Sequence, residues 1–155
     1  MVVGITNALN VVADGLPADL LPPPAEVGEP AASLLAELGV FHGGEAPAPF
    51  RLLAHDPAYL AELAAAWRHA FTDRRLGRRL KAALAFAVSL TTRSAFGSRF
   101  HLTELRRLGV GQRGVMEVIG VTQMFSSYTK IADTLALESD MGDIAPVDAT
   151  PAPGG

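Results

Sequence analysis

Apolar residues recur at three- and four-residue spacings over most of the chain, and this period is typical of amphipathic helices. It is clearest after Asp56-Pro57, where a carboxylate can cap a helix that has proline at its first position. This segment should end near Phe71, with the following residues facing a core: Tyr59, Leu60, Leu63, Ala66 and Trp67. No segment alternates with the period of a strand. The pattern therefore predicts an all-α protein.

The same period predicts four further helical segments. A short helix begins at Pro30 and runs through Leu38, where Gly39 should stop it. A helix start at Thr72-Asp73 leads into residues 80–90, which are apolar on nearly every side and typical of a central helix buried by its neighbours. A helix over 94–108 has an apolar stripe and ends at Gly109. The last helix, about 112–137, should point these residues inward: Val115, Val118, Ile119, Thr122, Phe125, Ile131 and Leu135.

Prolines, glycines and acidic residues mark the two ends of this helical region. Residues 1–28 contain three consecutive prolines and several glycines, which predicts an extended N-terminal arm with at most one short helical turn near 18–21. Residues 42–49 have the content of a loop. Residues 139–155 are acidic and then rich in proline and glycine, which predicts a flexible C-terminal tail. We therefore expect a single helical domain over 29–138.

Composition excludes several classes of partner. The chain has 155 residues, 49% of them apolar, and this is enough for one core of ordinary size. A formal net charge of −3 gives no electrostatic footprint for nucleic acid. The longest apolar run, 82–90, is shorter than the roughly 20 residues that span a bilayer, and no Lys or Arg precedes the apolar N-terminus as in a secretory signal. We therefore expect a soluble, cytoplasmic protein that binds neither nucleic acid nor membrane.

The chain contains no cysteine. It therefore has no disulfide, no thiolate nucleophile and no thiolate ligand for a metal. His42, His55 and His69 lack the spacing of metal ligands. We expect neither a metal nor a cofactor.

Four segments, in order along the chain, resemble one known family. They are Ala-Pro-Phe-Arg-Leu-Leu-Ala-His-Asp-Pro at 48–57, Lys-Ala-Ala-Leu-Ala-Phe-Ala-Val-Ser at 81–89, His101 with Glu-Leu-Arg-Arg-Leu-Gly-Val at 104–110, and 124–133, which is similar to Phe-Asn-x-x-Asn-Arg-x-Ala-Asp. Together they resemble the alkylhydroperoxidase D-like (carboxymuconolactone decarboxylase) superfamily, most closely its peroxidase-related branch, over roughly 30–138. The resemblance implies a helical bundle that forms homo-oligomers (dimers, trimers or hexamers).

The resemblance also implies a redox motif, Cys-x-x-Cys-x-x-x-His, with a glutamate about twelve positions upstream of the first cysteine. In this chain the two cysteines fall on Ser94 and Gly97, the glutamate on Ala82 and the histidine on His101. A serine hydroxyl neither ionises near neutral pH nor forms a disulfide, so it replaces neither the attacking nor the resolving thiol. Thiol peroxidase activity is therefore excluded.

The residues that remain allow two interpretations. Ser94, Ser98 and His101 share one helix face, so a Ser–His pair could act in nucleophilic or general-base catalysis, with Glu104 or Glu117 to orient the imidazole. In the other interpretation, His101 is an inherited structural residue of a site that has lost its chemistry. Beside this motif, Arg93 and Arg99 could hold a small carboxylate, with a hydroxyl from Tyr128, or they could be solvated charges beside a packing aromatic residue.

Two functions follow, and the sequence leaves open whether the chain is an enzyme. The leading hypothesis is a redox-inactive member of the superfamily with a binding, structural or regulatory role related to the oxidative stress response. The alternative is a cysteine-independent enzyme of the carboxymuconolactone decarboxylase type, in which His101 is the acid or base and the substrate is a small carboxylate.

Overall fold

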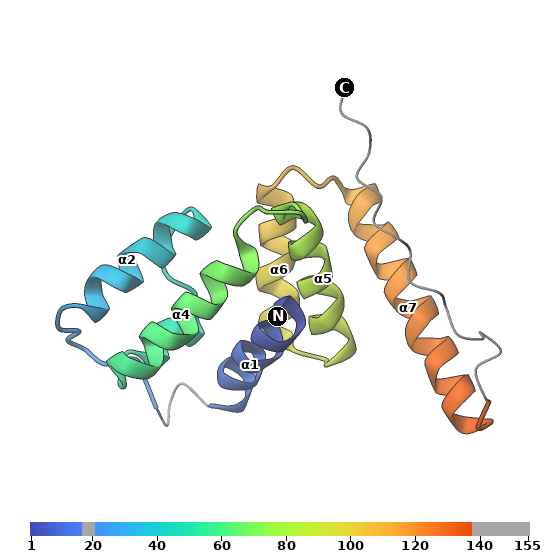
Figure 1. Cartoon of the computed structure of the whole chain (residues 1–155), viewed down its shortest axis with the longest axis horizontal. Helices are drawn as coiled ribbons and strands as arrows, with labels where there is room; N and C mark the ends of the chain where they lie inside the picture. The colour runs from blue at the N-terminus through green and yellow to red at the C-terminus, as the bar shows by residue number, and fades with distance from the viewer. Residues whose placement is uncertain (17–20, 138–155) are drawn as a thin grey trace, which may run out of the picture.

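The computed structural model describes residues 1–16 and 21–137, and this part of the chain forms seven helices and no strand (Figure 1). In order they are α1 (Val2–Gly15), α2 (Ala31–His42), α3 (Ala48–Leu53), α4 (Pro57–Phe71), α5 (Arg78–Thr91), α6 (Ala95–Arg107) and α7 (Gln112–Thr134). The all-α prediction is confirmed. Helix α5 is central, because it contacts α1, α4, α6 and α7. Within the described residues, no helix is both long and apolar enough to cross a bilayer.

The N-terminal helix α1 is an integral part of the core, so the prediction of an extended arm over 1–28 is wrong for residues 2–15. Helix α1 packs against α3, α4, α5 and α6 and buries Ile5, Thr6, Leu9 and Asn10. Val2 and Val12 pack on the same cluster, so apolar residues recur at helical spacing along one face. Residues 21–30, which include the three prolines, contain no helix. The tail expected over 139–155 lies outside the described residues.

Helix α2 does not stop at Gly39, as the sequence predicted, but continues to His42. Gly39 is buried, and a Cβ atom on it would lie 2.5 Å from the carbonyl oxygen of Gly44. The glycine therefore allows the returning chain to pass close to the helix. The helix ends at Gly43, whose left-handed conformation (φ 75°) suits a residue without a side chain. The four additional residues, 39–42, carry His42 into the core.

Helices α4 to α6 largely follow the sequence prediction. Asp56 caps α4 by accepting hydrogen bonds from the backbone N–H groups of Ala58 (3.1 Å) and Tyr59 (3.0 Å). The side chain of Tyr59, however, is exposed rather than buried. Helix α5 begins at Arg78 instead of near 72–73, because the Asp73 carboxylate accepts from the N–H of Arg78 and thus caps the helix from five residues upstream.

Helix α7 packs on the rest of the chain through only one of its faces (Figure 1). Val115 is its one buried residue, and Val118 and Ile119 pack beside it. The prediction that Phe125, Ile131 and Leu135 point inward is wrong, since these side chains are 63%, 52% and 62% exposed. On the neighbouring helix α5, Leu80 and Leu84 are also exposed, so this helix is not buried on every side. No other described element covers these residues.

The packing of α1 predicts a matched pair of substitutions. Replacing Leu9, which is 3% exposed, by alanine should lower the free energy of unfolding by about 2–5 kcal/mol, because it leaves a cavity in the core. Replacing Val11, which is 63% exposed on the same helix, should change it by less than about 0.5 kcal/mol. Urea denaturation followed by circular dichroism measures both. Equal small effects would mean that α1 does not belong to the core.

Candidate functional site

Ser94, to which the resemblance assigns the first cysteine, caps the helix that follows it. It is the N-cap residue of α6, and its hydroxyl oxygen accepts a hydrogen bond from the backbone N–H of Gly97 at 2.8 Å. Ser98 lies on the first turn of the same helix and is half-buried. Among the described residues, no hydrogen bond joins His101 to Ser94 or to Ser98. Ser94 therefore stabilises a helix end, and the described residues show no Ser–His pair.

Gly97, at the position of the second cysteine, lies directly beneath a side chain of α1. A Cβ atom on Gly97 would come within 2.2 Å of Oδ1 of Asn10 and 2.4 Å of Oγ of Ser89. Asn10 is held there, because its Nδ2 donates to Oγ of Ser89 at 3.0 Å and that hydroxyl donates to the carbonyl of Ala85 at 2.9 Å. The space that a thiol would need is thus filled by α1.

Ala82, at the position of the glutamate, is buried in an apolar cluster with Phe86, Leu105 and Val115. A carboxylate in that cluster would be a buried charge without a partner, which is strongly unfavourable. All three altered positions are therefore adapted to packing. The structure therefore has no space for a thiol at position 97 and no partner for a carboxylate at position 82.

His101 is packed among aromatic rings and is 2% exposed. Its ring lies nearly parallel to those of Phe71 (9°) and Trp67 (26°) and meets Phe100 edge-on at 4.9 Å. Burial lowers the pKa of His101 from 6.5 to about 4, although the negative charge of Glu104 opposes this shift. The imidazole is therefore neutral at pH 7, and it lines none of the surface pockets described below.

Glu104 is the centre of a buried polar network that joins four helices. Its carboxylate accepts hydrogen bonds from Arg78 (3.1 Å) and from Arg107 (2.9 and 3.0 Å). His42 accepts at Nε2 from the indole N–H of Trp67 (3.0 Å), so a neutral ring has its proton on Nδ1, which lies 3.3 Å from Glu104. Burial would raise the pKa of Glu104, but the close contact of His42 and the hydrogen bonds from Arg107 outweigh it and lower the pKa to about 2. The carboxylate is thus ionised and fully used by protein partners.

The sequence suggested Glu104 only as a partner for His101 and gave no role to His42. The bonds of Glu104 go instead to His42 and the two arginines, and Glu117 is exposed on α7. No local pattern could reveal this network, because its members come from α2, α4, α5 and α6. The one signal in the sequence was His42, a polar residue that follows the apolar residues of α2 and could have indicated a buried polar contact.

The histidines and carboxylates do not form a metal site in the described residues, where no three or more His, Asp or Glu side chains gather in a suitable group. His55 donates from Nε2 to the carbonyl of Pro22 at 2.8 Å. His69 accepts at Nδ1 from the guanidinium of Arg74 at 3.1 Å. These imidazoles are therefore used in local protein contacts.

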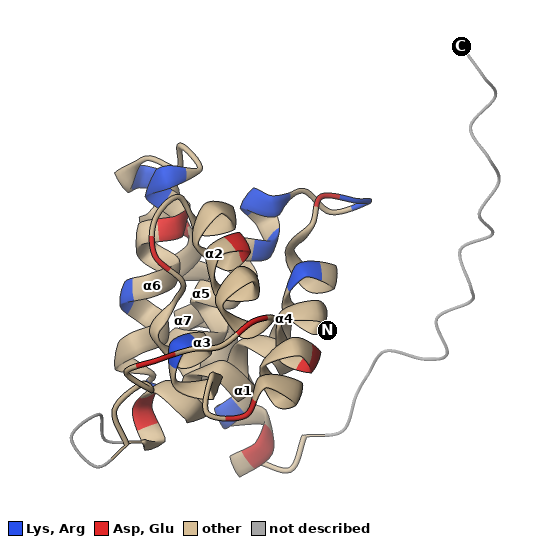
Figure 2. Cartoon of the chain, turned by 90° about the vertical axis from the view of Figure 1, so that its left-hand side faces the viewer, with Lys and Arg blue, Asp and Glu red and all other residues tan. Residues whose placement is uncertain are grey.

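Most Lys and Arg positions lie toward one end of the bundle, in the upper half of Figure 2, where α5 begins and α6 ends. Several of these cations are bound by protein groups. The Arg78 guanidinium lies 3.8 Å above the ring of Phe41, and Arg79 donates to the carbonyl of Leu108 at 2.7 Å. Lys81 donates to the carbonyl of Thr72 at 2.6 Å. These basic residues therefore hold the ends of helices together.

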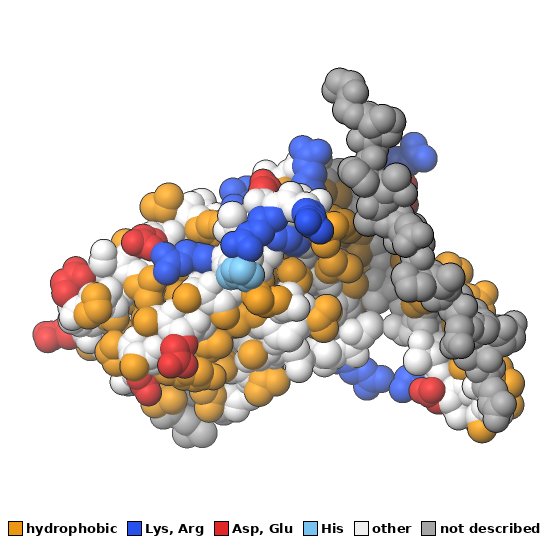
Figure 3. Space-filling model, in the orientation of Figure 1, with side chains coloured by type: hydrophobic (Ala, Val, Ile, Leu, Met, Phe, Trp, Pro, Cys, Tyr) orange, Lys and Arg blue, Asp and Glu red, His pale blue; other side chains and the backbone are white. Residues whose placement is uncertain are grey.

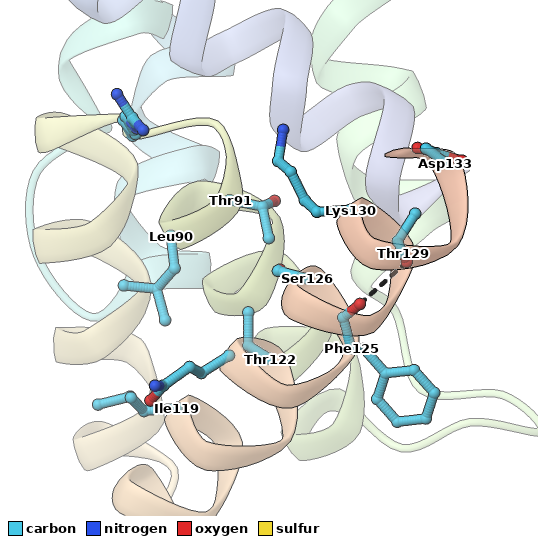
Figure 4. Close-up of a pocket in the computed structure, with 11 residues that line it drawn as sticks. Leu90, Thr91, Ile119, Thr122, Phe125, Ser126, Thr129, Lys130 and Asp133 are labelled. Carbon is cyan, nitrogen blue, oxygen red and sulfur yellow. Dashed lines mark hydrogen bonds between the residues drawn. The ribbon is translucent and has the colours of Figure 1, made fainter. Parts of the chain in front are cut away.

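A groove of about 690 Å³ lies between the end of α5 and helix α7 (Figure 4). Arg93 and Lys130 are its cations, and Asp133 is its one acidic residue. The hydroxyls of Thr91 (2.9 Å), Thr122 (2.6 Å) and Thr129 (2.9 Å) donate to carbonyls of their own helices. The rest of the lining is Leu90, Ile119, Gln123, Phe125 and Ser126. In Figure 4, Lys130 and Thr91 lie toward one end of the groove and Ile119 toward the other.

Arg93 has an unusual backbone conformation. Its φ of 58° lies in the left-handed region, which favours glycine and which other residues seldom adopt. Its side chain also lines a second, smaller pocket of about 190 Å³, between α1 and the turn from α5 to α6, where Asn10 and Ser94 are found. Arg93 therefore lies between the groove and the altered redox position.

The three residues that the sequence suggested for a carboxylate site are not brought together. Arg93 lines the groove, but Arg99 is exposed on α6 and lines none of the pockets described here. Tyr128 is 62% exposed and is not part of the groove lining. Lys130, which the sequence analysis did not single out, is the second cation of the groove.

The profile of the carboxymuconolactone decarboxylase family matches residues 57–137, which is more than half of the chain. The chain belongs to this family. No curated protein and no solved structure was found that matches it. The matched residues contain α4 to α7 and therefore Ser94, Gly97 and His101, whereas α1, whose Asn10 fills the redox position, precedes them. Because this family member has no cysteine, it is not a thiol peroxidase.

The contact between Gly97 and Asn10 predicts that even a single methyl group at position 97 is harmful. Gly97→Ala should lower the free energy of unfolding by about 1–3 kcal/mol through overpacking, despite the better helix propensity of alanine. In an Asn10→Ala background, the same substitution should cost much less. Denaturant unfolding of the four proteins in this cycle gives the coupling directly. Additive effects would contradict the packing described.

The burial of His101 predicts a pH dependence of stability. Since its folded pKa of about 4 lies below the 6.5 of an exposed histidine, its contribution is complete above pH 6.5 and is lost as the pH falls toward 4. The loss should be on the order of 3 kcal/mol. His101→Phe should flatten the profile of unfolding free energy between pH 6.5 and 4.5, whereas His69→Gln, on the exposed side of α4, should not. Profiles that stay parallel for all three proteins would refute this assignment.

Proposed function

We propose that this family member is a non-catalytic binding protein that takes a small organic carboxylate in the groove between α5 and α7. Its expected setting is the cytoplasm, with a regulatory rather than a redox role in the oxidative stress response. The observation that carries the binding proposal is the left-handed backbone of Arg93 at the groove. The stress-related setting follows from the resemblance to peroxidase relatives.

The left-handed conformation of Arg93 has a cost in free energy. A residue with a Cβ atom in the left-handed region is less stable than glycine by about 1–2 kcal/mol. The chain nevertheless has an arginine there, and strained residues of this kind cluster at ligand sites. A guanidinium offers paired N–H donors that match the two oxygens of a carboxylate. Arg93 is therefore well suited to select an anion.

The remainder of the groove fits a small organic molecule. Lys130 supplies a second positive charge, and Leu90 and Ile119 supply apolar surface for a carbon skeleton. Apolar walls with a few polar groups, in a volume of roughly 300–1,000 Å³, are typical of small-molecule sites. The ligand proposed here is therefore a carboxylate with an apolar body.

The geometry gives less support to the alternative, a decarboxylase-type enzyme with His101 as acid or base. A catalytic imidazole must reach its substrate directly or through one water molecule. His101 is 2% exposed, is surrounded by Trp67, Phe71 and Phe100, and does not line the groove. We therefore prefer a binding function to a catalytic one.

The binding proposal is tested by Arg93→Gly, which separates ligand recognition from folding. Isothermal titration with succinate, adipate and benzoate at low salt should find at least one ligand, and the variant should bind it about ten- to a hundredfold more weakly. The melting temperature without ligand should stay equal or rise, because glycine relieves the left-handed strain. Arg99→Ala, off the groove, is the control and should bind normally.

Two results would contradict the proposed function. Absence of binding for every carboxylate, or unchanged affinity in Arg93→Gly, would remove the ligand site. Consumption of hydrogen peroxide or an organic hydroperoxide by the pure, metal-free protein would remove the non-catalytic part of the proposal.

A further inference from the structure

One end of the bundle carries an excess of positive charge. Residues 72–81 and 104–113, where α5 and α7 begin and α6 ends, contain eight of the 13 Lys and Arg residues and two of the 16 Asp and Glu residues. Lys and Arg side chains gather along the upper edge of the molecule in Figure 3. The remainder of the chain is acidic, because the net charge of the whole chain is −3. The charge of the molecule is therefore strongly asymmetric.

The two carboxylates at this end are already used by the fold. Asp73 accepts a hydrogen bond from the backbone N–H of Arg78. Glu104 is buried against Arg78, Arg107 and His42. Within the described residues, five exposed arginines at this end have no carboxylate within ion-pair distance, and they are Arg74, Arg75, Arg79, Arg106 and Arg113. We call these five residues the arginine end.

Most of these guanidinium groups make no contact that the fold requires. In the part of the chain that the structure describes, the side chains of Arg75, Arg106 and Arg113 form no hydrogen bond, and Arg74 and Arg79 use one donor each. Like charges that lie close together repel one another, and this repulsion destabilises the folded state. A cluster that lowers stability and makes few internal contacts is expected to act on an external anion.

The side chains at this end suit a partner that carries both carboxylates and apolar groups. The exposed cations are all arginines, since the one lysine, Lys81, is 6% exposed and donates to the carbonyl of Thr72. The planar fork of an arginine matches the two oxygens of a carboxylate. Between the arginines, Leu76 and Leu80 are 48% and 49% exposed and offer apolar contact. An acidic peptide with apolar side chains satisfies both kinds of group.

A nucleic acid fits the same residues less well. Residues 72–81 and 104–113 contain no aromatic side chain on which a base could stack. A long phosphate backbone would also extend beyond the arginine end toward the acidic remainder of the chain, where like charges repel it. A short acidic segment covers the arginine end alone and avoids this repulsion.

We propose that the arginine end binds a short acidic segment of another protein, in which apolar residues are interspersed with Asp and Glu. The arginines pair with the carboxylates of this segment, and Leu76 and Leu80 contact its apolar side chains. The surface is separate from the groove, which lies beside Leu90 and Thr91 at the other end of α5, about 20 Å of helix away. The proposal therefore does not depend on what the groove binds.

Fluorescence anisotropy of the full chain with a labelled, end-capped peptide, Glu-Leu-Glu-Glu-Leu-Glu, tests this proposal. The wild type should bind this peptide at least about tenfold more tightly than the same peptide with glutamine in place of glutamate. Raising the salt concentration from about 25 to about 200 mM should weaken binding roughly tenfold, because exposed ion pairs are screened.

Two double variants with the same change in charge locate the binding surface. Arg75→Glu/Arg106→Glu should weaken binding of the glutamate peptide at least about tenfold, and its melting temperature should not fall, because neither side chain has a hydrogen bond to the described residues. Arg51→Glu/Arg99→Glu is the matched control, since both arginines are exposed and lie outside the arginine end. Its affinity should stay within about threefold of the wild type.

The chain contains no cysteine, so a single introduced thiol can be labelled as an independent probe. An environment-sensitive fluorophore on Leu76→Cys lies at the arginine end, and one on Tyr59→Cys lies at the start of α4. The glutamate peptide should change the emission at position 76 only. No peptide binding, equal loss of affinity in the two double variants, or a response only at position 59 would overturn the proposal. Tighter binding of single-stranded DNA or phosphatidylserine vesicles than of the peptide at the same salt concentration would also overturn it, since the partner would then be of another class.

Discussion

A carboxylate that is buried among four helices must be paired with donors, and Glu104 meets this requirement with three side chains. Arg107 is on its own helix α6, Arg78 comes from α5 and His42 from α2. The indole of Trp67 on α4 fixes the proton of His42 on the side that faces Glu104. Removal of any of these partners would leave a buried charge or donor unsatisfied, so the network fixes the relative positions of all four helices.

The aromatic cluster depends on this network. The ring of His42 contacts Phe41, Trp67 and Phe100, and the rings of Trp67 and Phe100 in turn contact His101. Burial in this cluster lowers the pKa of His101 and keeps its imidazole neutral. His101 is therefore part of the core, and Asn10 of α1 fills the space beside Gly97.

The accessible polar groups of the groove lie at the edge formed by α5 and α7. Within the bundle, the former redox positions cap a helix, allow close packing or fill an apolar cluster. At the edge, a strained arginine, a lysine and apolar walls remain open. The same helix α7 supplies a wall of the groove on one face and exposes apolar side chains on the other.

Much of the helical order could be predicted from local signals. Asp56-Pro57 and Ser94 are capping residues whose effect is confined to one helical turn, and Gly109 ends α6 with a φ of 80° that suits glycine. The prediction of helix bounds failed where the conformation of a residue depends on a neighbour that is distant in the sequence. Gly39 was interpreted as a helix stop, yet it lies inside α2 and allows residues 44–46 to pass close to that helix. The three prolines after α1 led to the prediction of an extended arm, although residues 2–15 form a helix that packs on α5.

The sequence by itself determined that this protein is all-α and that it has no thiol chemistry, because helical periodicity and the absence of a sulfur nucleophile are properties of the chain alone. Only the tertiary structure decided that His101 is buried, that Glu104 binds His42, and that Arg93 shares a groove with Lys130. The exposure of the apolar side chains on the outer face of α7 was decided in the same way. A period indicates which residues share a helix face, but burial depends on which other helices cover that face, and those helices come from elsewhere in the chain.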